Sequence, residues 1–332
     1  MIGRFAPAEC KGWQSIVLGD RMTGGKWVKN LQAETPLAEA ARRTLRTRLD
    51  AVKKYLNLVV KKHQDPENVH QLRVSSRRTA AALDMFEDCL PSKVHSKAKK
   101  KLKNLRRAAG AARDWDVFLQ SFKSRAVPAK VRDGLNLVIG YALSQRQAAE
   151  TQLESAAQNL SKKFGKLAKK VVTSAPRAAS QDKPATLADL ARQAVRPLVR
   201  ALSRAAHRDL TDADNLHKVR IAGKRLRYAM EILAPAFGAS FREKLYPAVQ
   251  QMQDILGQAN DSRFAMARIG ELREQLEKNS TPGKRNRTAL ADLVSYHQAR
   301  WDRERQRFNR WWQAWQKSGG EQAFTELVRT GK

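Results

Sequence analysis

Cysteine is nearly absent from this chain: its 332 residues contain only Cys10 and Cys89. Two such distant cysteines give neither a disulfide framework nor the paired spacing of a metal site, and they suit a reducing compartment. No apolar run approaches the roughly 18 residues that a membrane span requires. Residues 1–21 lack the basic start, apolar run and cleavage site of a secretory signal. We therefore expect a cytoplasmic protein without a membrane segment.

Acidic residues are too few to balance the basic ones. The chain has 32 Asp+Glu against 64 Lys+Arg, which gives a formal net charge of +32 and a pI near 10.7. Hydrophobic residues make up 42% of the chain, which is enough for a packed core, so the excess charge does not indicate a disordered tail. A charge of this size makes a polyanion the natural partner.

The motifs of several enzyme classes are missing. The sequence has no phosphate-binding P-loop, no G-x-G-x-x-G dinucleotide motif and no H-E-x-x-H zinc motif. The six histidines lack the carboxylate or cysteine spacing of a metal site. We therefore expect no metal and no cofactor, and we favour a non-enzymatic role.

One stretch of sequence is present twice. Residues 65–78 read DPENVHQLRVSSRR, and residues 212–225 read DADNLHKVRIAGKR. Both fit D-x-x-N-h-H-x-h-R-h-x-x-[RK]-R, where h is apolar. The same interval of 147 residues pairs Asp114 with Asp261 without a gap. A repeat of this length indicates a duplicated domain rather than a solenoid.

Each copy of this stretch predicts a capped helix with one basic stripe. Asp65 and Asp212 are good N-caps, and apolar residues flank the stripe on both sides. At about 100° per residue, the stripe contains His70, Arg73 and Arg77 in the first copy and His217, Arg220 and Lys224 in the second. A cation between apolar shoulders is costly unless an anion binds it. We expect the stripes to line an anion-binding groove; the alternative is that acids of neighbouring helices neutralise them.

The fold class follows from helical periodicity throughout and the lack of strand or hairpin signals. The expected helices span residues 37–62, 65–90, 93–122 and 128–164, then 186–208, 212–234, 241–276 and 282–317. Residues 1–35 are expected to form an irregular extension, 165–185 a linker and 318–332 a tail. This pattern predicts an all-α protein of two four-helix bundles, 36–164 and 186–317, related by duplication as a pseudo-two-fold pair.

Further basic positions are expected to extend the anion surface. Arg42 and Arg46 on the first helix are repeated, at a slightly different offset, by Arg192 and Arg196 in the second half. The lysine-rich helix over 93–122 adds several cations, among which we select Lys97 and Lys101. The last helix is expected to bury a row that includes Trp301, Trp312 and Trp315, and to expose Arg303 and Arg307 on its opposite face.

The doubled motif, followed in each half by Gly-Ala-Ala-Arg-Asp (110–114) or Gly-Gln-Ala-Asn-Asp (257–261), resembles the CHAD domain family over about residues 36–317. The resemblance implies two four-helix bundles that together form one domain and bind inorganic polyphosphate. The residues it places on the basic anion surface are His70, Arg73, Arg77, Arg78, His217, Arg220, Lys224 and Arg225. The chain lacks the E-x-E-x-K motif of the triphosphate-tunnel domain to which CHAD domains are often fused. The halves also differ, because Ser262 and Arg263 stand where the first copy has Trp115 and Asp116.

Three functions stay open on the sequence. The first is non-catalytic binding of polyphosphate, with polyphosphate granules as one place where it would occur. The second is nucleic-acid binding, which the charge suits equally well, although single-strand recognition usually adds exposed aromatic residues. The third and weakest is an enzyme acting on phosphate chains. Asp114 and Asp261 are expected to orient neighbouring cations, with a divalent ion as the alternative, and His70 and His217 to donate hydrogen bonds to phosphate, with bridging between helices as the alternative.

Overall fold

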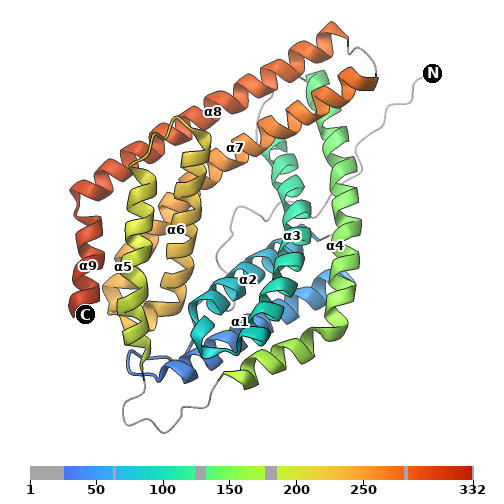
Figure 1. Ribbon diagram of the computed structural model, residues 1–332. Coiled ribbons are helices and arrows are strands. Elements are labelled where there is room, and N and C mark those ends of the chain that lie inside the picture. The colour runs from blue at the N-terminus through green and yellow to red at the C-terminus, as the bar shows by residue number, and fades with distance from the viewer. Residues whose placement is uncertain (1–25, 63–64, 124–131, 176–184, 280–282, 331–332) are drawn as a thin grey trace.

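The computed structural model describes residues 26–62, 65–123, 132–175, 185–279 and 283–330. Within these ranges all named elements are helices, which confirms the predicted all-α class (Figure 1). The α-helices are α1 (Leu37–Lys61), α2 (Pro66–Met85), α3 (Ser92–Lys123), α4 (Arg132–Ser174), α5 (Leu187–Ala206), α6 (Ala213–Leu233), α7 (Tyr246–Asn279), α8 (Lys284–Lys317) and α9 (Gly320–Thr330). Two 3₁₀ turns, η1 (Glu87–Cys89) and η3 (Ala234–Ala236), and one π-helical turn, η4 (Phe241–Leu245), connect some of them.

The two motif helices begin with the same cap. The side chain of Asp65 accepts a hydrogen bond from the backbone N–H of Glu67 at 2.9 Å, and Asp212 accepts one from Asp214 at 2.8 Å. A capping carboxylate also interacts favourably with the positive end of the helix dipole. The duplicated sequence therefore builds the same local structure twice.

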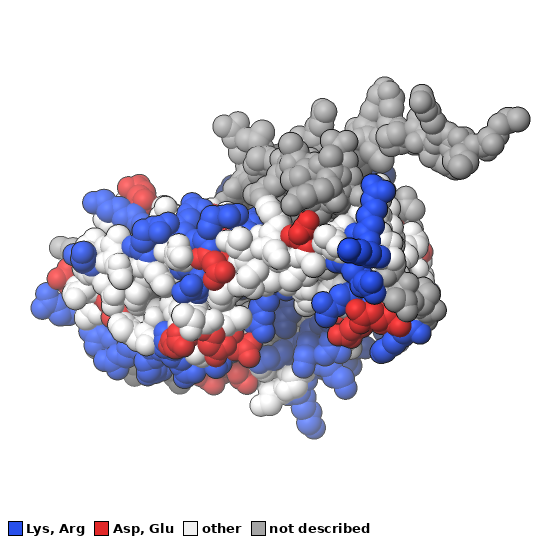
Figure 2. All heavy atoms as spheres, turned by 90° about the horizontal axis from the view of Figure 1, so that it is seen from above, with Lys and Arg blue, Asp and Glu red and all other residues white. Residues whose placement is uncertain are grey.

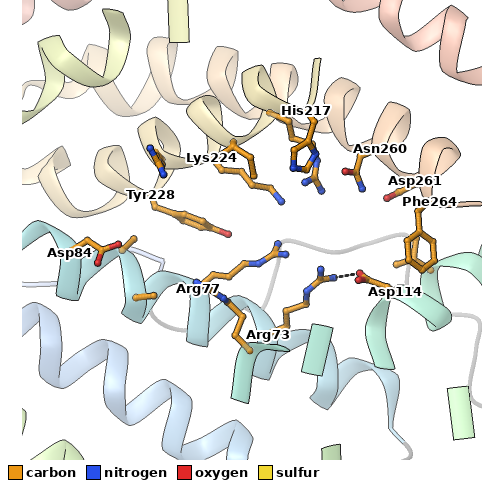
Figure 3. Close-up of a pocket in the computed structure, with 17 residues that line it drawn as sticks. Arg73, Arg77, Asp84, Asp114, His217, Lys224, Tyr228, Asn260, Asp261 and Phe264 are labelled. Atoms are coloured by element: carbon orange, nitrogen blue, oxygen red, sulfur yellow. Dashed lines mark ion pairs between the residues drawn. The ribbon is translucent and has the colours of Figure 1, made fainter. Parts of the chain in front are cut away.

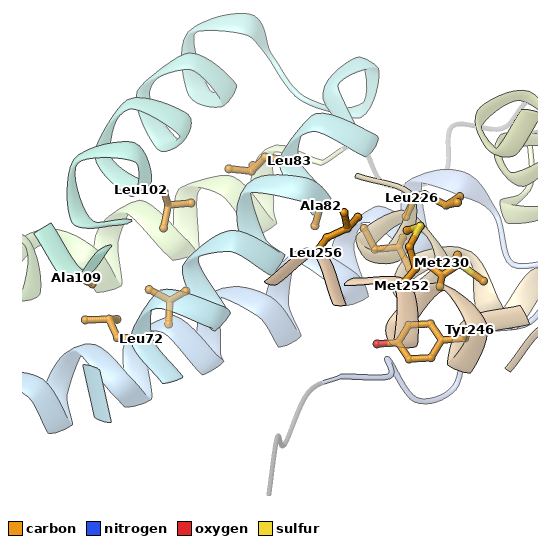
Figure 4. Packing of buried hydrophobic residues seen from close by; sticks show 14 of the residues in the cluster. Leu72, Ala82, Leu83, Leu102, Ala109, Leu226, Met230, Tyr246, Met252 and Leu256 are labelled. Carbon is orange, nitrogen blue, oxygen red and sulfur yellow. The ribbon is translucent and has the colours of Figure 1, made fainter. Parts of the chain in front are cut away.

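The first four helices contact one another in a closed cycle, α1 with α2, α2 with α3, α3 with α4 and α4 with α1. In the second half α5 packs on α6, α6 on α7 and α7 on α8, while α9 packs against α5 and α8. One hydrophobic cluster runs through both halves, and Figure 4 shows members from each, Leu72, Leu83 and Leu102 from the first and Leu226, Met230 and Met252 from the second. The packing is compatible with two four-helix units related by duplication.

Three expected boundaries were wrong. Helix α4 continues through Ser174, into the expected linker, because Val171 and Val172 keep its apolar face buried. Most of the expected C-terminal tail forms α9, which buries Phe324 and Leu327. Helix α2 ends at Met85 and gives way to the turn η1. The expected helix starts at 128 and 282 and the rest of the expected linker, 176–184, lie outside the described residues.

The segment before α1 is irregular, as expected, over its described residues 26–36, but it belongs to the core. Val28 and Leu31 are buried, and the ring of Trp27 lies 5.0 Å from that of Tyr246 at the start of α7. Residues 26–36 therefore pack against the second half of the chain.

The two halves contact each other just before α1 and just before α5. Pro36 and Thr186 form an isolated antiparallel bridge, in which Leu37 N donates to Ala185 O at 2.8 Å and Leu187 N donates to Thr35 O at 2.9 Å. These positions, just before α1 and α5, are equivalent in the repeat. Helix α2 also contacts α6, so the two motif helices lie side by side.

A buried ionic network also connects the halves. Arg78 on α2 donates to Glu231 on α6 through Nε at 2.7 Å and Nη2 at 3.2 Å. Tyr246 donates to the same carboxylate at 2.9 Å, and the guanidinium of Arg48 lies 3.7 Å from it. Burial lowers the pKa of Arg48 to about 10, although the charge of Glu231 acts to raise it. One carboxylate of the second half thus neutralises cations of the first.

The outer surface carries the excess positive charge. Figure 2 shows Lys and Arg side chains spread over the face seen from above and gathered around a hollow in it, with fewer acidic side chains between them. In the described parts of the chain, no helix combines the length and the apolar character needed to cross a membrane.

We predict that Glu231→Ala destabilises the protein by about 3–5 kcal/mol, since it leaves Arg48 and Arg78 as buried cations without their carboxylate. The measurement is urea unfolding at pH 7, followed by circular dichroism. The matched control is Glu277→Ala, which removes an exposed partner of Arg273 and should cost less than about 1 kcal/mol. Equal losses in the two variants would contradict the structural role of Glu231.

Candidate anion-binding site

A pocket of about 650 Å³ lies between the motif helices of the two halves. Helices α2 and α6 form its facing walls, and residues of α3 and α7 complete it (Figure 3). Six of its lining residues carry cationic groups, Arg73, Arg77, Arg106, Arg220, Lys224 and Arg225. Because α2 packs beside α6, the two sequence-predicted stripes contribute to one site rather than two.

The side chains of the two stripes converge on this pocket. In Figure 3, Arg73 and Arg77 extend from α2, while Lys224 and His217 extend toward them from α6. Residues two turns apart on one helix face, such as His217 and Lys224, necessarily point the same way. The stripe periodicity and the α2–α6 contact together bring these side chains together.

The acids in the pocket are too few to neutralise it. Only Asp84, Asp114 and Asp261 line it beside the six cations. Asp114 pairs with Arg73 at 2.8 Å, and Asp84 pairs with Lys99 of α3 at 2.6 Å. Burial raises the pKa of Asp261, against the effect of Arg220 and other nearby cations, which lower it. Most of the pocket's positive charge therefore stays uncompensated.

Hydrogen bonding within the pocket is also incomplete. The Nε–H groups of Arg73 and Arg220 are buried and have no hydrogen-bond partner among the described residues. A buried donor without an acceptor costs free energy. Both arginines therefore carry an unsatisfied donor beside the pocket.

The surroundings of Lys224 strongly disfavour its protonated form. Within the described chain it has no hydrogen bond or ion pair, and burial together with Arg220, Arg77 and Arg73 lowers its pKa to about 5. Burial also lowers the pKa of Arg220, to about 10, so that this guanidinium keeps its charge at neutral pH. The pocket thus combines arginines that keep a pKa well above neutral pH with an amine whose pKa lies below it.

The two motif histidines occupy different environments. His217 lines the pocket, and burial, followed by the charge of Arg220, lowers its pKa. His70 does not line the pocket; burial and the charges of Arg113 and Arg73 lower its pKa to about 4. Near neutral pH His70 is therefore an uncharged side chain packed among arginines, and a contact with phosphate stays a prediction for it.

Several other predicted site residues lie outside this pocket. Arg78 is buried and bonded to Glu231, because its position faces α6 on the opposite side of the contact. Arg42 and Arg192 pair with acids of their own helices, Glu39 and Asp189. Four exposed cations, which also do not line it, are Arg46, Arg196, Lys97 and Lys101. They contribute to the field of the surface, and direct contacts stay a prediction.

The structure adds pocket residues that the motif did not single out. Arg106 lines the pocket from α3, one turn before Gly110, which the 147-residue interval pairs with Gly257. Asn260 lines the pocket from α7, beside Asp261. Tyr228 follows Lys224 by four residues and thus extends the stripe of α6 by one turn, a signal that helical spacing could have given. Phe264 lies at the end of the pocket near Asp114 in Figure 3.

The repeat relates the two sides of the α2–α6 contact. The closed side holds the buried network around Glu231, and the open side holds the pocket. On the closed side Glu231 holds Arg78 and Tyr246. The residues at the equivalent repeat positions are Asp84, Arg225 and Lys99. There Asp84 pairs with Lys99, whereas Arg225 lines the pocket without an ion pair among the described residues. The pocket is thus the open counterpart of the buried network.

Comparisons with known proteins yield the following similarities. The model of the CHAD domain family matches residues 43–270. The chain is 27% identical to the CHAD domain from the plant Ricinus communis, with a TM-score of 0.64 over 82% of this chain and 89% of that chain. It shares the fold of PptA from Streptomyces chartreusis at 18% identity, with a TM-score of 0.64 over 84% of this chain and 100% of that one. A search of curated proteins gave no match.

We predict that Lys224→Met raises the free energy of unfolding of the ligand-free protein by about 1–3 kcal/mol at pH 7, because methionine fills this half-buried position without an amine that the neighbouring arginines repel. The folded-state pKa of Lys224, about 5, lies below its ordinary value of 10.5. Between these pH values the unfolded chain binds a proton that the folded chain does not, so this residue's penalty grows as pH falls. The gain in the variant should therefore be larger at pH 6 than at pH 9.

Urea unfolding at the two pH values measures this effect. The control is Lys218→Met, which changes an exposed lysine on the same helix and should alter stability by less than about 0.5 kcal/mol. A loss of stability in Lys224→Met at both pH values would show that the amine is not a cost to the fold.

Proposed function

Because the chain belongs to the CHAD domain family, whose model matches residues 43–270, we propose that it binds inorganic polyphosphate in the pocket between α2 and α6. This family is associated with the binding of polyphosphate and triphosphate. The observation that carries the proposal is the set of pocket cations that three acids leave uncompensated. Binding of this kind would place the protein at polyphosphate granules where these are present.

The chemistry of the pocket suits a phosphate chain. A guanidinium offers N–H groups in a planar fork that matches phosphate oxygens, and Arg73, Arg77 and Arg220 present such groups from both walls. A polyphosphate chain carries about one charge per unit and has no base edges to read. Its recognition therefore needs a cluster of cations and no sequence-reading element.

The aromatic residues favour polyphosphate over single-stranded nucleic acid. Trp301, Trp312 and Trp315 of α8 are each no more than 7% exposed, as the periodicity of that helix predicted. Binding of single strands usually relies on exposed rings on which bases stack. These three rings are packed in the core. They therefore offer no surface on which the bases of a single strand could stack.

The protonation of Lys224 and His217 should change when an anion binds in the pocket. A phosphate beside Lys224 and His217 stabilises their protonated forms and so raises their lowered pKa values. Arg73 and Arg77 from α2 and Arg220 from α6 oppose protonation. Asp261 from α7 interacts with Lys224 and favours its protonation. Binding is therefore coupled to proton uptake.

We expect two double variants, Arg73→Ala with Arg77→Ala and Arg220→Ala with Lys224→Ala, each to lose on the order of tenfold or more in affinity for long polyphosphate. Both walls contact the same ligand, so each change weakens the same binding event. Isothermal titration calorimetry at fixed salt measures the loss. The charge-matched control is Arg303→Ala with Arg307→Ala on the exposed face of α8. If this control loses as much affinity, binding follows total charge and not the pocket.

Proton uptake gives a second expected result. Polyphosphate affinity of the wild type should increase as pH falls from 8 to 6, since Lys224 and His217 are more readily protonated in the complex at lower pH. Calorimetry in buffers of different ionisation enthalpy should detect net proton uptake, and Lys224→Met should take up fewer protons. Equal uptake by the two proteins would exclude Lys224 as the coupled group.

Competition separates polyphosphate from nucleic acid. We expect long polyphosphate to displace a labelled polyphosphate at lower concentration than DNA or RNA of matched charge. Equal competition would favour the nucleic-acid alternative.

We also propose that the protein does not process the chain that it binds. Polyphosphate incubated with the purified protein and Mg²⁺ or Mn²⁺ should keep its length, as read on a gel. Steady phosphate release that survives repurification and is lost in Arg220→Ala would contradict a non-catalytic role.

A further inference from the structure

A second basic groove runs along α1, away from the pocket. Helices α1 and α4 lie side by side along the lower edge of the molecule in Figure 1. A hollow of about 330 Å³ opens between them, and a second hollow, of about 450 Å³, lies between α1 and the segment before it. Arg46 lines both hollows, so together they form one groove, which we call the α1 groove. Lys29 and Arg43 line its second part, where Arg43 also pairs with Glu39.

The α1 groove has more cations than acids. Arg46 and Lys53 of α1 and Lys169 of α4 line its first part. All three side chains are exposed, and none has an ion pair among the described residues. Asp50 is the one carboxylate among the described residues that line the groove. Most of the positive charge of the groove is therefore uncompensated.

The first half keeps this surface open where the second half covers the equivalent one. Gly165 and Ala168 line the groove from α4, and no atom lies within 4 Å of the position that a Cβ on Gly165 would take. In the second half α9 packs against both α5 and α8 and buries Phe324 and Leu327. Within the described chain no third helix packs in this way against both α1 and α4. The groove thus lies where its repeat counterpart is a packed helix.

The α1 groove and the pocket lie on opposite sides of the first four helices. Because these helices contact one another in a closed cycle, the side formed by α1 and α4 is across from the side formed by α2 and α3. Helices α2 and α3 provide the first-half residues of the pocket. The interior between the two sides is packed with buried side chains such as Leu45, Leu49 and Leu72. One short phosphate chain therefore cannot contact both surfaces at once.

We propose that the α1 groove is a second polyphosphate site, with which the protein bridges two polyphosphate chains or two distant stretches of one chain. The inference rests on the proposed function, because it assigns the same ligand to another surface. The groove cations are solvated, so this site binds a phosphate chain more weakly than the pocket does and responds more strongly to salt. Two sites on opposite sides make the protein bivalent, and a bivalent protein links long chains into a network.

The shape and lining of the groove suit a narrow chain without bases. A groove between two packed helices admits a single chain more readily than a duplex. The aromatic residue in its described lining is Trp27, whose ring lies 5.0 Å from that of Tyr246. The cationic groups of Lys26 and Arg242 lie 5.5 and 5.1 Å from the same ring. The ring is thus engaged within the protein, whereas single-strand binding usually relies on rings that are free to stack.

Footprinting of the full chain locates the second site. The N-hydroxysuccinimide ester of acetic acid modifies exposed lysines, and mass spectrometry of peptides follows each of them at increasing tripolyphosphate. At a ligand concentration of about ten times Kd about a tenth of the sites stay free, so acetylation of Lys53 and Lys169 should slow on the order of tenfold. Lys278, an exposed lysine of α7, is the control and should stay reactive. Protection of Lys53 and Lys169 no greater than that of Lys278 would overturn the inference.

Light scattering measures bridging when the protein is mixed with long polyphosphate at fixed salt. A groove variant that loses three cations should scatter on the order of threefold less than a variant that loses three exposed cations of α8. The groove variant carries Arg46→Ala, Lys53→Ala and Lys169→Ala. The charge-matched control carries Arg303→Ala, Arg307→Ala and Arg310→Ala. Equal scattering by the two variants would show that bridging follows total charge, and the inference would be wrong.

Three outcomes separate the groove, the pocket and nucleic acid. If Arg73→Ala with Arg77→Ala keeps full affinity for polyphosphate while Lys53 and Lys169 are protected, the groove site holds and the proposed pocket is wrong. If the pocket variants weaken binding but tripolyphosphate does not protect these lysines, the proposed function holds and the inference is wrong. If a short oligonucleotide of matched charge protects them at lower concentration than tripolyphosphate, the groove belongs to nucleic acid and the inference is again wrong.

Discussion

The pairing of Arg78 with Glu231 is the contact on which the arrangement of the two halves depends. It joins α2 of the first half to α6 of the second inside the core, where Arg48 and Tyr246 also approach the carboxylate. A buried charge cluster of this kind is sensitive to geometry, because losing one partner leaves the others without compensation. The contact thus holds the motif helices side by side, and the pocket exists because they are held there.

Duplication makes the opposite side of this contact informative. The repeat places Asp84 where the second half has Glu231, and Arg225 where the first has Arg78. In the buried network Arg78 pairs with Glu231. On the other side Asp84 pairs with Lys99, and Arg225 lines the pocket. Equivalent positions of the two copies therefore build a buried ionic network on one side and line a pocket on the other. A site whose charges are left uncompensated lowers stability, a common cost of function.

The charge state of the pocket differs from what its residue types suggest. Arginines keep their protons because their ordinary pKa is so high, and burial brings that of Arg220 only to about 10. Lysine starts lower, so the same surroundings bring Lys224 to about 5. The pocket residues therefore carry less charge than their residue types imply, because lysine and arginine differ in their ordinary pKa values.

Sequence by itself determined the helical class, the paired caps at Asp65 and Asp212, and the basic stripes of the duplicated helices, since these depend on neighbours within a few residues. It also determined the excess of positive charge. Only the tertiary structure decided that Arg78 turns to a carboxylate 153 residues away, that α4 continues beyond its expected end, and that both stripes share one pocket. It also decided that burial and the neighbouring arginines lower the pKa of Lys224. Ion pairing between distant segments and removal from water depend on how the helices pack, which the periodicity of each helix does not contain.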